Sequence, residues 1–268
     1  MKTTIHAAAI LLALASLPLR AATEKDQQDI LKQVGFTQNL GQTIPLDLPF
    51  RDEKGQAVTL RKYFGSKPVL LNLVYFECPM LCTEVLNGIV RTLRAIPLKV
   101  DDDFNVVTVS FDPRETPKLA ALKKSMYLDR YGHPDRGAGW PFLTGDQKSI
   151  KALADAVGFH FAYDPDLQQF AHASGIIILT PAGKVSHYFF GVEYPAQDVR
   201  LSLVEAGEGH TGSPVDQLLM YCYHYDPETG RYGIVVMRVL RLAALATFLA
   251  LGSFVVIMLW KEKRPKAA

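Results

Sequence analysis

The sequence lacks a strong excess of charge of either sign. Its 268 residues include 29 Lys and Arg and 27 Asp and Glu, which gives a formal net charge of +2. Such a balance provides no general attraction to nucleic acid. The sequence also has no phosphate-binding glycine loop, no Ser/His/Asp order, no metalloprotease helix motif and no internal repeat. These absences argue against nucleotide, serine-hydrolase and zinc-protease sites and against a repeat architecture.

Long hydrophobic runs are scarce in this chain, and the two that matter lie near its ends. At the N-terminus, Lys2 precedes the apolar stretch Ala7–Leu17, and Ala21 and Ala22 are small residues suited to cleavage. The stretch is shorter than the roughly 20 residues that span a bilayer. We therefore predict a cleaved signal peptide over residues 1–22, with retention as a signal anchor as the alternative.

The second run, Leu242–Trp260, contains no charged residue. As a helix it would be about 29 Å long, close to the hydrocarbon thickness of a bilayer. It is followed by a basic cluster: Lys261, Lys263, Arg264 and Lys266. By the positive-inside rule, we expect a transmembrane helix over residues 239–260, a cytoplasmic tail over 261–268 and a periplasmic or otherwise extracytoplasmic main domain, which makes a single-pass protein of the cell membrane.

Between the two ends, strand and helix patterns alternate. Strands are expected at 69–76, 104–111, 176–179 and 184–190, after a hairpin at 46–60, and helices at 81–96, 117–131, 149–157 and 195–206. This order predicts an α/β fold of the thioredoxin-like type, a central mixed sheet flanked by helices, within residues 23–207. Residues 23–41 read as a polar lead-in with a short helical pattern. Residues 208–238 contain several Gly and Pro and read as a linker or appendage.

Cys78 and Cys82 lie where the first buried strand is expected to turn into a helix. Four residues of separation place two side chains one helical turn apart, on the same face. The unpaired N–H groups of a helix N-terminus favour the thiolate. The spacing leaves three interpretations open, namely a structural disulfide, a redox-active dithiol, or two soft ligands suited to Cu(I) and less to Zn²⁺.

A metal site would need a third ligand, and His172 is the candidate. It precedes the apolar run Ile176–Leu179, so we expect it in the loop entering a central strand, near the cysteine edge. An imidazole and two thiolates would suit both Cu(II) and Cu(I). The remaining histidines have no comparable position: His133, His160, His187 and His210, with His6 in the predicted signal.

Four segments in this order carry a family resemblance: VYFECPMLC, VSFDPRETP, WPFLTG and FAHASGIIILTPAGKV. Together they resemble the Sco/SenC family of copper chaperones for cytochrome c oxidase, over about residues 44–207. The resemblance implies a thioredoxin fold in which Cys78, Cys82 and His172 hold one copper ion. It also implies delivery of copper to the binuclear site of oxidase subunit II, or maintenance of that site's thiols.

The sequence departs from the family pattern in two places. Ala171 stands before the histidine, where the family often has Asp, and the expected membrane helix follows the domain instead of preceding it. Two other functions stay open: a metal-independent thiol–disulfide oxidoreductase that uses Cys78 and Cys82, and a non-catalytic interaction domain in which the pair forms a disulfide. Copper delivery and thiol reduction use the same dithiol, so the sequence does not separate these two functions.

Two further groups of residues are weighed for a role. Asp112 and Glu115 follow the second buried strand, and their carboxylates would either orient a ligand or partner, or serve only a turn and a helix start; we favour the second. Cys222 and His224, flanked by tyrosines, are candidates for an extra metal site, a docking point or an intermolecular disulfide, or they pack as part of an aromatic linker.

Overall fold

The computed structural model describes residue 30, residues 32–78 and 81–211, and in the C-terminal part residues 225–226 and 231–232 with separate positions between 241 and 253. The chain divides into two compact units, Met1–Thr211 and Gly212–Ala268. The predicted signal peptide, Cys222, His224 and the basic tail lie outside the described residues. Within the described part, no helix has both the length and the apolar character needed to cross a membrane.

The second unit contains one small element of sheet. Strand β11 (Tyr225–Asp226) pairs antiparallel with β12 (Arg231–Tyr232), within the segment expected to be a linker. The positions described between 241 and 253 are helical.

The first unit is built on a mixed five-stranded sheet in the order β10-β9-β4-β5-β6. Its strands are β4 (Val69–Val74), β5 (Asn105–Ser110), β6 (Phe142–Leu143), β9 (Gly175–Leu179) and β10 (Val185–Phe190). Strands β4, β5 and β6 are parallel, whereas β9 runs antiparallel to β4 and β10 antiparallel to β9. Every residue of β4 is buried, as expected for a central strand covered on both faces. The predicted mixed sheet is confirmed.

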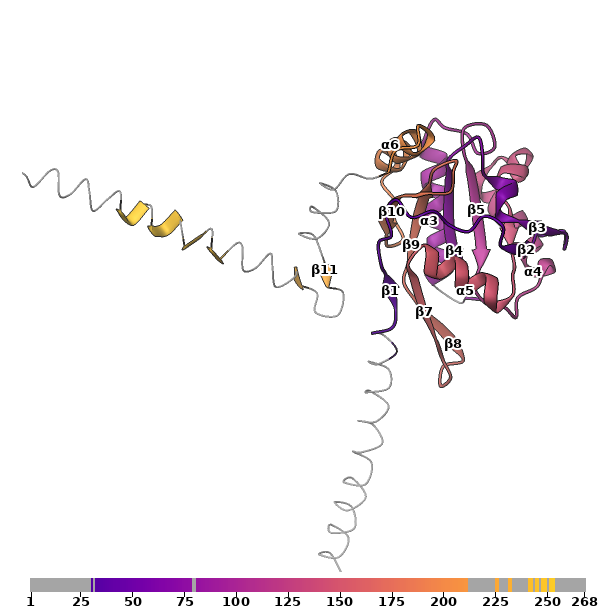
Figure 1. The fold of residues 1–268 in the computed structure, drawn as a ribbon, viewed down its shortest axis with the longest axis horizontal. Coiled ribbons are helices and arrows are strands. Elements are labelled where there is room, and N and C mark those ends of the chain that lie inside the picture. Colours follow the sequence, from indigo (N-terminus) through magenta and orange to yellow (C-terminus); the bar gives the residue numbers. More distant parts are fainter. Residues whose placement is uncertain are drawn as a thin grey trace, which may run out of the picture. The chain divides into compact units, whose positions relative to one another are not determined.

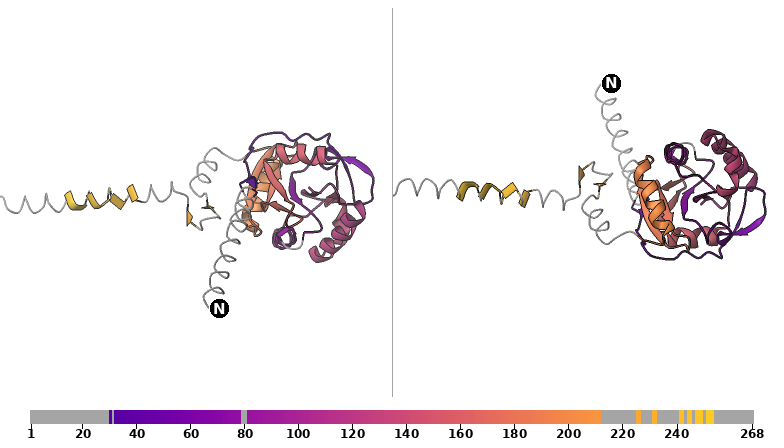
Figure 2. Two further views of the ribbon diagram at one scale, coloured as in Figure 1. Left: turned by 90° about the horizontal axis from the view of Figure 1, so that it is seen from below. Right: turned by 90° about the horizontal axis from the view of Figure 1, so that it is seen from above.

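Helices cover both faces of this sheet. They are α3 (Leu81–Ala95), α4 (Pro117–Tyr131), α5 (Gln147–Ala156) and α6 (Ala196–Gly207), with short 3-10 helices η1 (Leu60–Tyr63) and η2 (Pro134–Gly139). Helix α3 contacts both α4 and α6, and Figure 2 shows α5 on the opposite side of the sheet from α3 and α4. This is the layering of a thioredoxin-like domain, with the core between the sheet and each helix layer.

Local signals explain several elements. The hairpin of β2 (Pro49–Arg51) and β3 (Ala57–Thr59) forms as predicted, because the Asp52 carboxylate accepts hydrogen bonds from the N–H groups of Lys54 and Gln56 and closes the turn. Helix α4 has the predicted bounds, since Thr116 caps its first turn and Pro117 opens it.

A second, three-stranded sheet was not predicted. Strands β7 (Phe159–Asp164) and β8 (Gln169–His172) form a hairpin, and β1 (Gly35–Phe36) pairs with β7. Figure 1 shows the β7–β8 hairpin projecting beyond the main sheet. The expectation for residues 23–41 missed β1, and the expectation that His172 lies in a loop was wrong, since it is the last residue of β8.

Candidate functional site

The candidate site forms where two parallel strands end side by side. Val74 of β4 is in register with Ser110 of β5, and the Phe111 N–H donates to the Val74 carbonyl at 2.9 Å. The loop that carries Cys78 and the loop that follows Phe111 therefore leave the sheet at the same edge. In open α/β sheets this edge is where sites are commonly built.

Cys78 and Cys82 are both buried, with exposed fractions of 7% and 2%. The Cys82 N–H donates to the Cys78 sulfur at 3.3 Å, and the Tyr75 N–H donates to the Cys82 sulfur at 3.3 Å. Backbone N–H groups thus point at both sulfur atoms and favour the thiolate, but at Cys82 burial outweighs this effect and raises the pKa. The pair lies at the strand-to-helix turn expected from the sequence.

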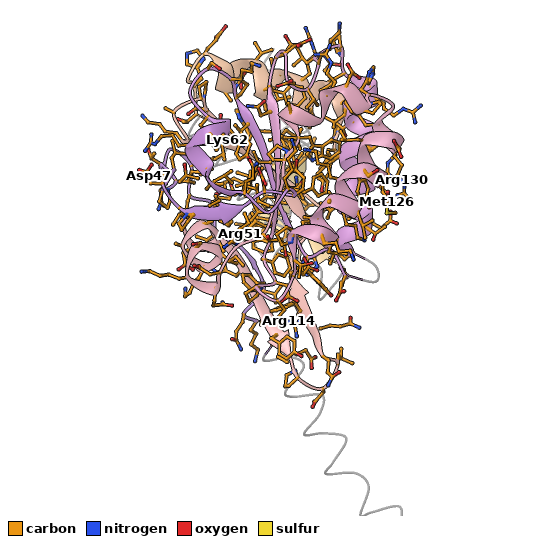
Figure 3. All side chains as sticks on the ribbon, turned by 90° about the vertical axis from the view of Figure 1, so that its right-hand side faces the viewer. Asp47, Arg51, Lys62, Arg114, Met126 and Arg130 are labelled. Atoms are coloured by element: carbon orange, nitrogen blue, oxygen red, sulfur yellow. The ribbon has the colours of Figure 1, made fainter. Side chains whose placement is uncertain are left out.

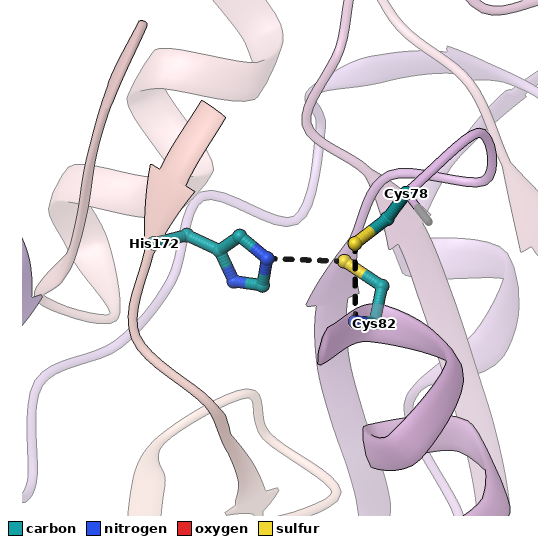
Figure 4. A group of neighbouring side chains, drawn as sticks. All are labelled: Cys78, Cys82 and His172. Carbon is teal, nitrogen blue, oxygen red and sulfur yellow. Dashed lines mark hydrogen bonds between the residues drawn. The ribbon is translucent and has the colours of Figure 1, made fainter. Parts of the chain in front are cut away.

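His172 completes a three-residue group with the cysteines (Figure 4). Its Nε2 lies 3.2 Å from the Cys82 sulfur, and its Nδ1–H donates to the Ala173 carbonyl at 2.8 Å. This second bond fixes the tautomer and leaves the Nε2 lone pair facing the sulfur. The ligand atoms of Cys78, Cys82 and His172 all lie within 4.8 Å of one another, and the three residues form a group that could hold a metal ion.

The Ala173 carbonyl bears on one departure from the family pattern. Ala171 offers no carboxylate to orient the histidine, and the backbone carbonyl of Ala173 takes that part instead. A carbonyl is a common partner for the second ring nitrogen of a metal-binding histidine.

Aromatic rings surround the His172 imidazole. The ring centroids of Phe111 and Tyr75 lie 5.2 and 5.8 Å from that of His172, and that of Phe159 lies 6.4 Å away. These rings limit the rotation of the histidine and exclude water from one side of the site. The imidazole therefore meets the thiols in buried, largely apolar surroundings.

Glu115 fastens the loop before Cys78. Its carboxylate accepts hydrogen bonds from the N–H groups of Phe76 and Glu77, at 2.8 and 2.7 Å, and from the Ser110 hydroxyl at 2.5 Å. The favoured interpretation, a helix start alone, is thus incomplete for this residue. Its position four residues past the end of the predicted second strand, at the edge where the cysteines were expected, is the signal that could have revealed the contact.

Asp112 has the predicted turn role. It accepts a hydrogen bond from the Arg114 N–H at 2.9 Å and pairs with the Arg114 guanidinium through bonds of 2.8 and 2.7 Å. The fork-shaped pair makes the loop rigid.

Burial sets the protonation of the site in the absence of a cation. Burial and the side chain of Cys78 raise the pKa of the Cys82 thiol above its usual value. Burial also raises the pKa of Tyr75, helped by a hydrogen bond with the Cys78 side chain. Both groups are therefore neutral in this state, and a cation that binds the Cys82 sulfur has to displace its proton.

The other histidines in the described residues engage ordinary partners. His160 bonds the Thr37 hydroxyl at 2.8 Å, His187 lies 3.3 Å from Glu205, and His133 packs on the Tyr131 ring at 4.8 Å between centroids. His210 lies 3.6 Å from Glu208. None of these four joins a group of three potential metal ligands within the described part of the chain.

Solved structures share this fold. The chain has a TM-score of 0.55 and 24% identity to a protein from Aquifex aeolicus, covering 64% of this chain and 96% of that one. BsSco, described as a member of the Sco family of cytochrome c oxidase assembly proteins, gives 0.50 and 23%, covering 64% and 98%. A copper-bound ScoI from Bradyrhizobium japonicum is 26% identical, covering 61% and 99%, with a TM-score of 0.46.

Comparisons of the sequence with known proteins and families give two further matches. Over 86 residues the chain is 39% identical to alkyl hydroperoxide reductase E of Mycobacterium tuberculosis, which covers 32% of this chain and 53% of that protein. The chain thus spans about half the length of the curated relatives that it matches. The SCO1/SenC family model matches residues 38–203, more than half of the chain, and includes all three residues of the site. The chain therefore belongs to the SCO1/SenC family.

Proposed function

We propose that this protein binds one copper ion through Cys78, Cys82 and His172 and delivers it to the binuclear copper site of cytochrome c oxidase subunit II. The observation that carries the proposal is the convergence of the two sulfurs and the imidazole Nε2 within 4.8 Å. Membership in the SCO1/SenC family supports it.

The donor set favours copper over harder cations. Two thiolates and an imidazole suit Cu(I), and Cu(II) accepts the same donors, whereas Mg²⁺ and Ca²⁺ prefer oxygen ligands. Zn²⁺ would accept these donors too, but its protein sites usually have four ligands. Within the described residues, no fourth Cys, His or carboxylate joins the group.

The ion is cargo in this proposal, so the residues have to release it as well as hold it. Both cysteines give up their protons to solvent when the ion binds and recover protons when it leaves. Because the Cys82 thiol is buried and its pKa is raised, reprotonation of Cys82 favours release once a partner's own soft ligands engage the ion.

Reduction of a client disulfide is a second candidate function, favoured by the close spacing of the two cysteines at the start of α3. In that reaction one cysteine attacks a client disulfide and the other resolves the mixed disulfide. The client gains two thiols while Cys78 and Cys82 become a disulfide. No metal takes part, and His172 would be dispensable.

We further propose that the domain is extracytoplasmic and tethered by a membrane helix at residues 239–260. The support is the uncharged run Leu242–Trp260 with basic residues after it. A tether would confine the search for an oxidase subunit to the membrane plane and raise the effective concentration of each partner.

A transfer experiment tests delivery. The copper-loaded full chain in detergent is mixed with the reduced copper-accepting domain of an oxidase subunit II, and copper is measured on each protein after separation. We expect copper on the acceptor and thiols on the donor. In a parallel reaction, metal-free protein is mixed with the oxidised acceptor. Copper that stays on the donor in the first reaction, with reduction of the acceptor's disulfide by wild type and equally by His172→Ala in the second, would contradict delivery and support the reductase.

Oxidation of the cysteine pair provides a second check. A Cys78–Cys82 disulfide leaves no thiolate for the ion, so we expect the oxidised protein to bind no copper at the site and to regain binding after reduction. Equal copper content of the oxidised and reduced proteins would contradict the assignment of the two cysteines as ligands.

A further inference from the structure

The candidate ligands come from two separate parts of the fold. Cys78 and Cys82 lie on the turn between β4 and α3, whereas His172 ends the β7–β8 hairpin. We propose that the neighbouring residues Arg114 and Glu115 are positioning residues that hold these two parts together. Glu115 bonds the loop before Cys78, and Arg114 contacts the hairpin that carries His172. The inference rests on the proposed metal site, because the role assigned to Arg114 and Glu115 is to align the three candidate ligands.

Glu115 holds the cysteine-bearing loop through hydrogen bonds. It accepts hydrogen bonds from two successive N–H groups of the loop, those of Phe76 and Glu77, directly before Cys78. Each bond is charge-assisted and no longer than 2.8 Å, which places it among the stronger hydrogen bonds in proteins. Replacement of the carboxylate by an amide would leave one acceptor oxygen for these two N–H groups and free the loop to shift.

Arg114 contacts the β7–β8 hairpin through its guanidinium group. Its guanidinium lies over the ring of Tyr163 on β7 at 5.3 Å and over that of Phe170 on β8 at 5.4 Å. These are cation–π distances, and the contact covers both strands of the hairpin. Figure 3 shows Arg114 at the end of the molecule from which the hairpin projects.

Arg114 and Glu115 are themselves held by hydrogen bonds to residues at or just after the end of β5. Asp112 accepts hydrogen bonds from the Arg114 backbone and guanidinium, so the arginine is fixed before it meets the hairpin. Ser110, at the end of β5, donates a hydrogen bond from its hydroxyl to the Glu115 carboxylate. Because residues 114 and 115 are adjacent on a short loop, a shift of one part changes the position of the other.

Open space beside the loop makes the Arg114 contact important. A cleft of about 490 Å³ is lined by Glu77 of the cysteine loop, by Arg114 and Glu115, and by Tyr163 and Gln168 of the hairpin. Arg114 lines this space and contacts the hairpin beside it, in addition to the contacts that Phe111 makes with Phe161 and Phe170. An opening hairpin would carry His172 away from the Cys82 sulfur.

Substitutions separate the contribution of Glu115 from that of Arg114. Glu115→Gln removes the charge but keeps the shape, and Arg114→Ala removes the stacked guanidinium. Asp103→Asn is the control for the first, because Asp103 also accepts a short bond from a backbone N–H, that of Lys99 at 2.7 Å. Arg61→Ala is the control for the second, because it removes an exposed Arg–Asp pair of 2.7 Å.

The two substitutions should differ in whether their effect on copper affinity requires His172. We expect Glu115→Gln to lower copper affinity about 10- to 100-fold, both in the wild-type protein and in the His172→Ala background. We expect Arg114→Ala to lower it about three- to tenfold in the wild type and to have no further effect once His172 is absent. Nitrogen coupling in the Cu(II) electron paramagnetic resonance spectrum should weaken only in Arg114→Ala.

Readouts on the metal-free chain keep this test independent of the proposed function. Amide exchange over residues 159–172 should speed up in Arg114→Ala, and alkylation of the buried thiols should speed up in Glu115→Gln, each by about tenfold relative to its control. If wild type binds no copper, the proposed function fails while these two readouts still decide the inference. Both variants behaving like their controls would overturn it, as would an Arg114→Ala loss of affinity that persists without His172.

Discussion

Tyr75 shows at the residue scale how one side chain serves the core and the site together. It is 6% exposed, its ring contacts those of Phe111 and His172, and its hydroxyl hydrogen-bonds the Cys78 side chain. The ring limits how the imidazole turns, and the hydroxyl orients one candidate ligand. These two contributions are separable by mutation.

Tyr75→Phe keeps the ring and removes only the hydroxyl. We expect a loss of about 1 kcal/mol in the free energy of unfolding and a severalfold loss of copper affinity. Tyr194→Phe is the control, since its hydroxyl donates to the Gly191 carbonyl at 2.8 Å. Urea unfolding should give similar losses for both variants, and copper titration should separate them. Unchanged copper affinity in Tyr75→Phe would contradict an orienting role for the hydroxyl.

At the element scale, α3 places Cys82, and its packing depends on Gly88. A Cβ at that position would lie 2.0 Å from the Val192 carbonyl oxygen, which is backbone and has little freedom to move away. The glycine allows the helix to approach the segment between β10 and α6. The position of the cysteine turn therefore depends on a contact two helical turns away from it.

Gly88→Ala tests this contact. Alanine is the better helix former by about 1 kcal/mol, but the overlap should outweigh that gain and destabilise the domain by about 1–3 kcal/mol. Arg94→Ala, at an exposed position of the same helix, should change stability by less than about 0.5 kcal/mol. Thermal or urea unfolding measures both. A stabilised Gly88→Ala protein would show that α3 does not pack as closely as the structure indicates.

The elements that sequence patterns located correctly are those with local signals. Helix α4 has Thr116 and Pro117 at its start and ends at Gly132, whose φ of 85° favours glycine. The apolar run of β4, interrupted by Asn72, is equally local. The helix start and the strand end also placed Cys78 and Cys82 at one edge of the sheet.

The β7–β8 hairpin was missed because its stability comes from distant partners. Strand β7 pairs with Gly35 and Phe36, and the contact from Phe111 reaches the hairpin from β5. An alternation of aromatic and other residues, Phe159, Phe161 and Tyr163, was the available signal for a strand. Glu115 was underestimated for the same reason: its partners lie 38 and 39 positions away.

At the scale of the whole molecule, every residue of the candidate site belongs to the first unit, Met1–Thr211. The proposed tether belongs to the second unit, Gly212–Ala268. Binding of the ion and attachment to the membrane are therefore assigned to different parts of the chain. Each should be removable without loss of the other.

A stop codon after Thr211 tests this separation. We expect the full chain to remain with membranes after an alkaline carbonate wash and the shortened chain to appear in the soluble fraction of the cell exterior. Copper affinity of the two should agree within about twofold, because no ligand is lost. Release of the full chain by carbonate would contradict the tether, and loss of copper binding on truncation would contradict the assignment of the site to the first unit.

The central claim is that Cys78, Cys82 and His172 hold one copper ion. The most direct measurement is the copper content and absorption spectrum of the reduced full chain in detergent, for wild type and His172→Ala. The account predicts about one copper per wild-type chain, with thiolate-to-copper charge-transfer bands in the Cu(II) form that shift or weaken in the variant. Absence of copper from the wild-type protein, or a spectrum unchanged by His172→Ala, would contradict it.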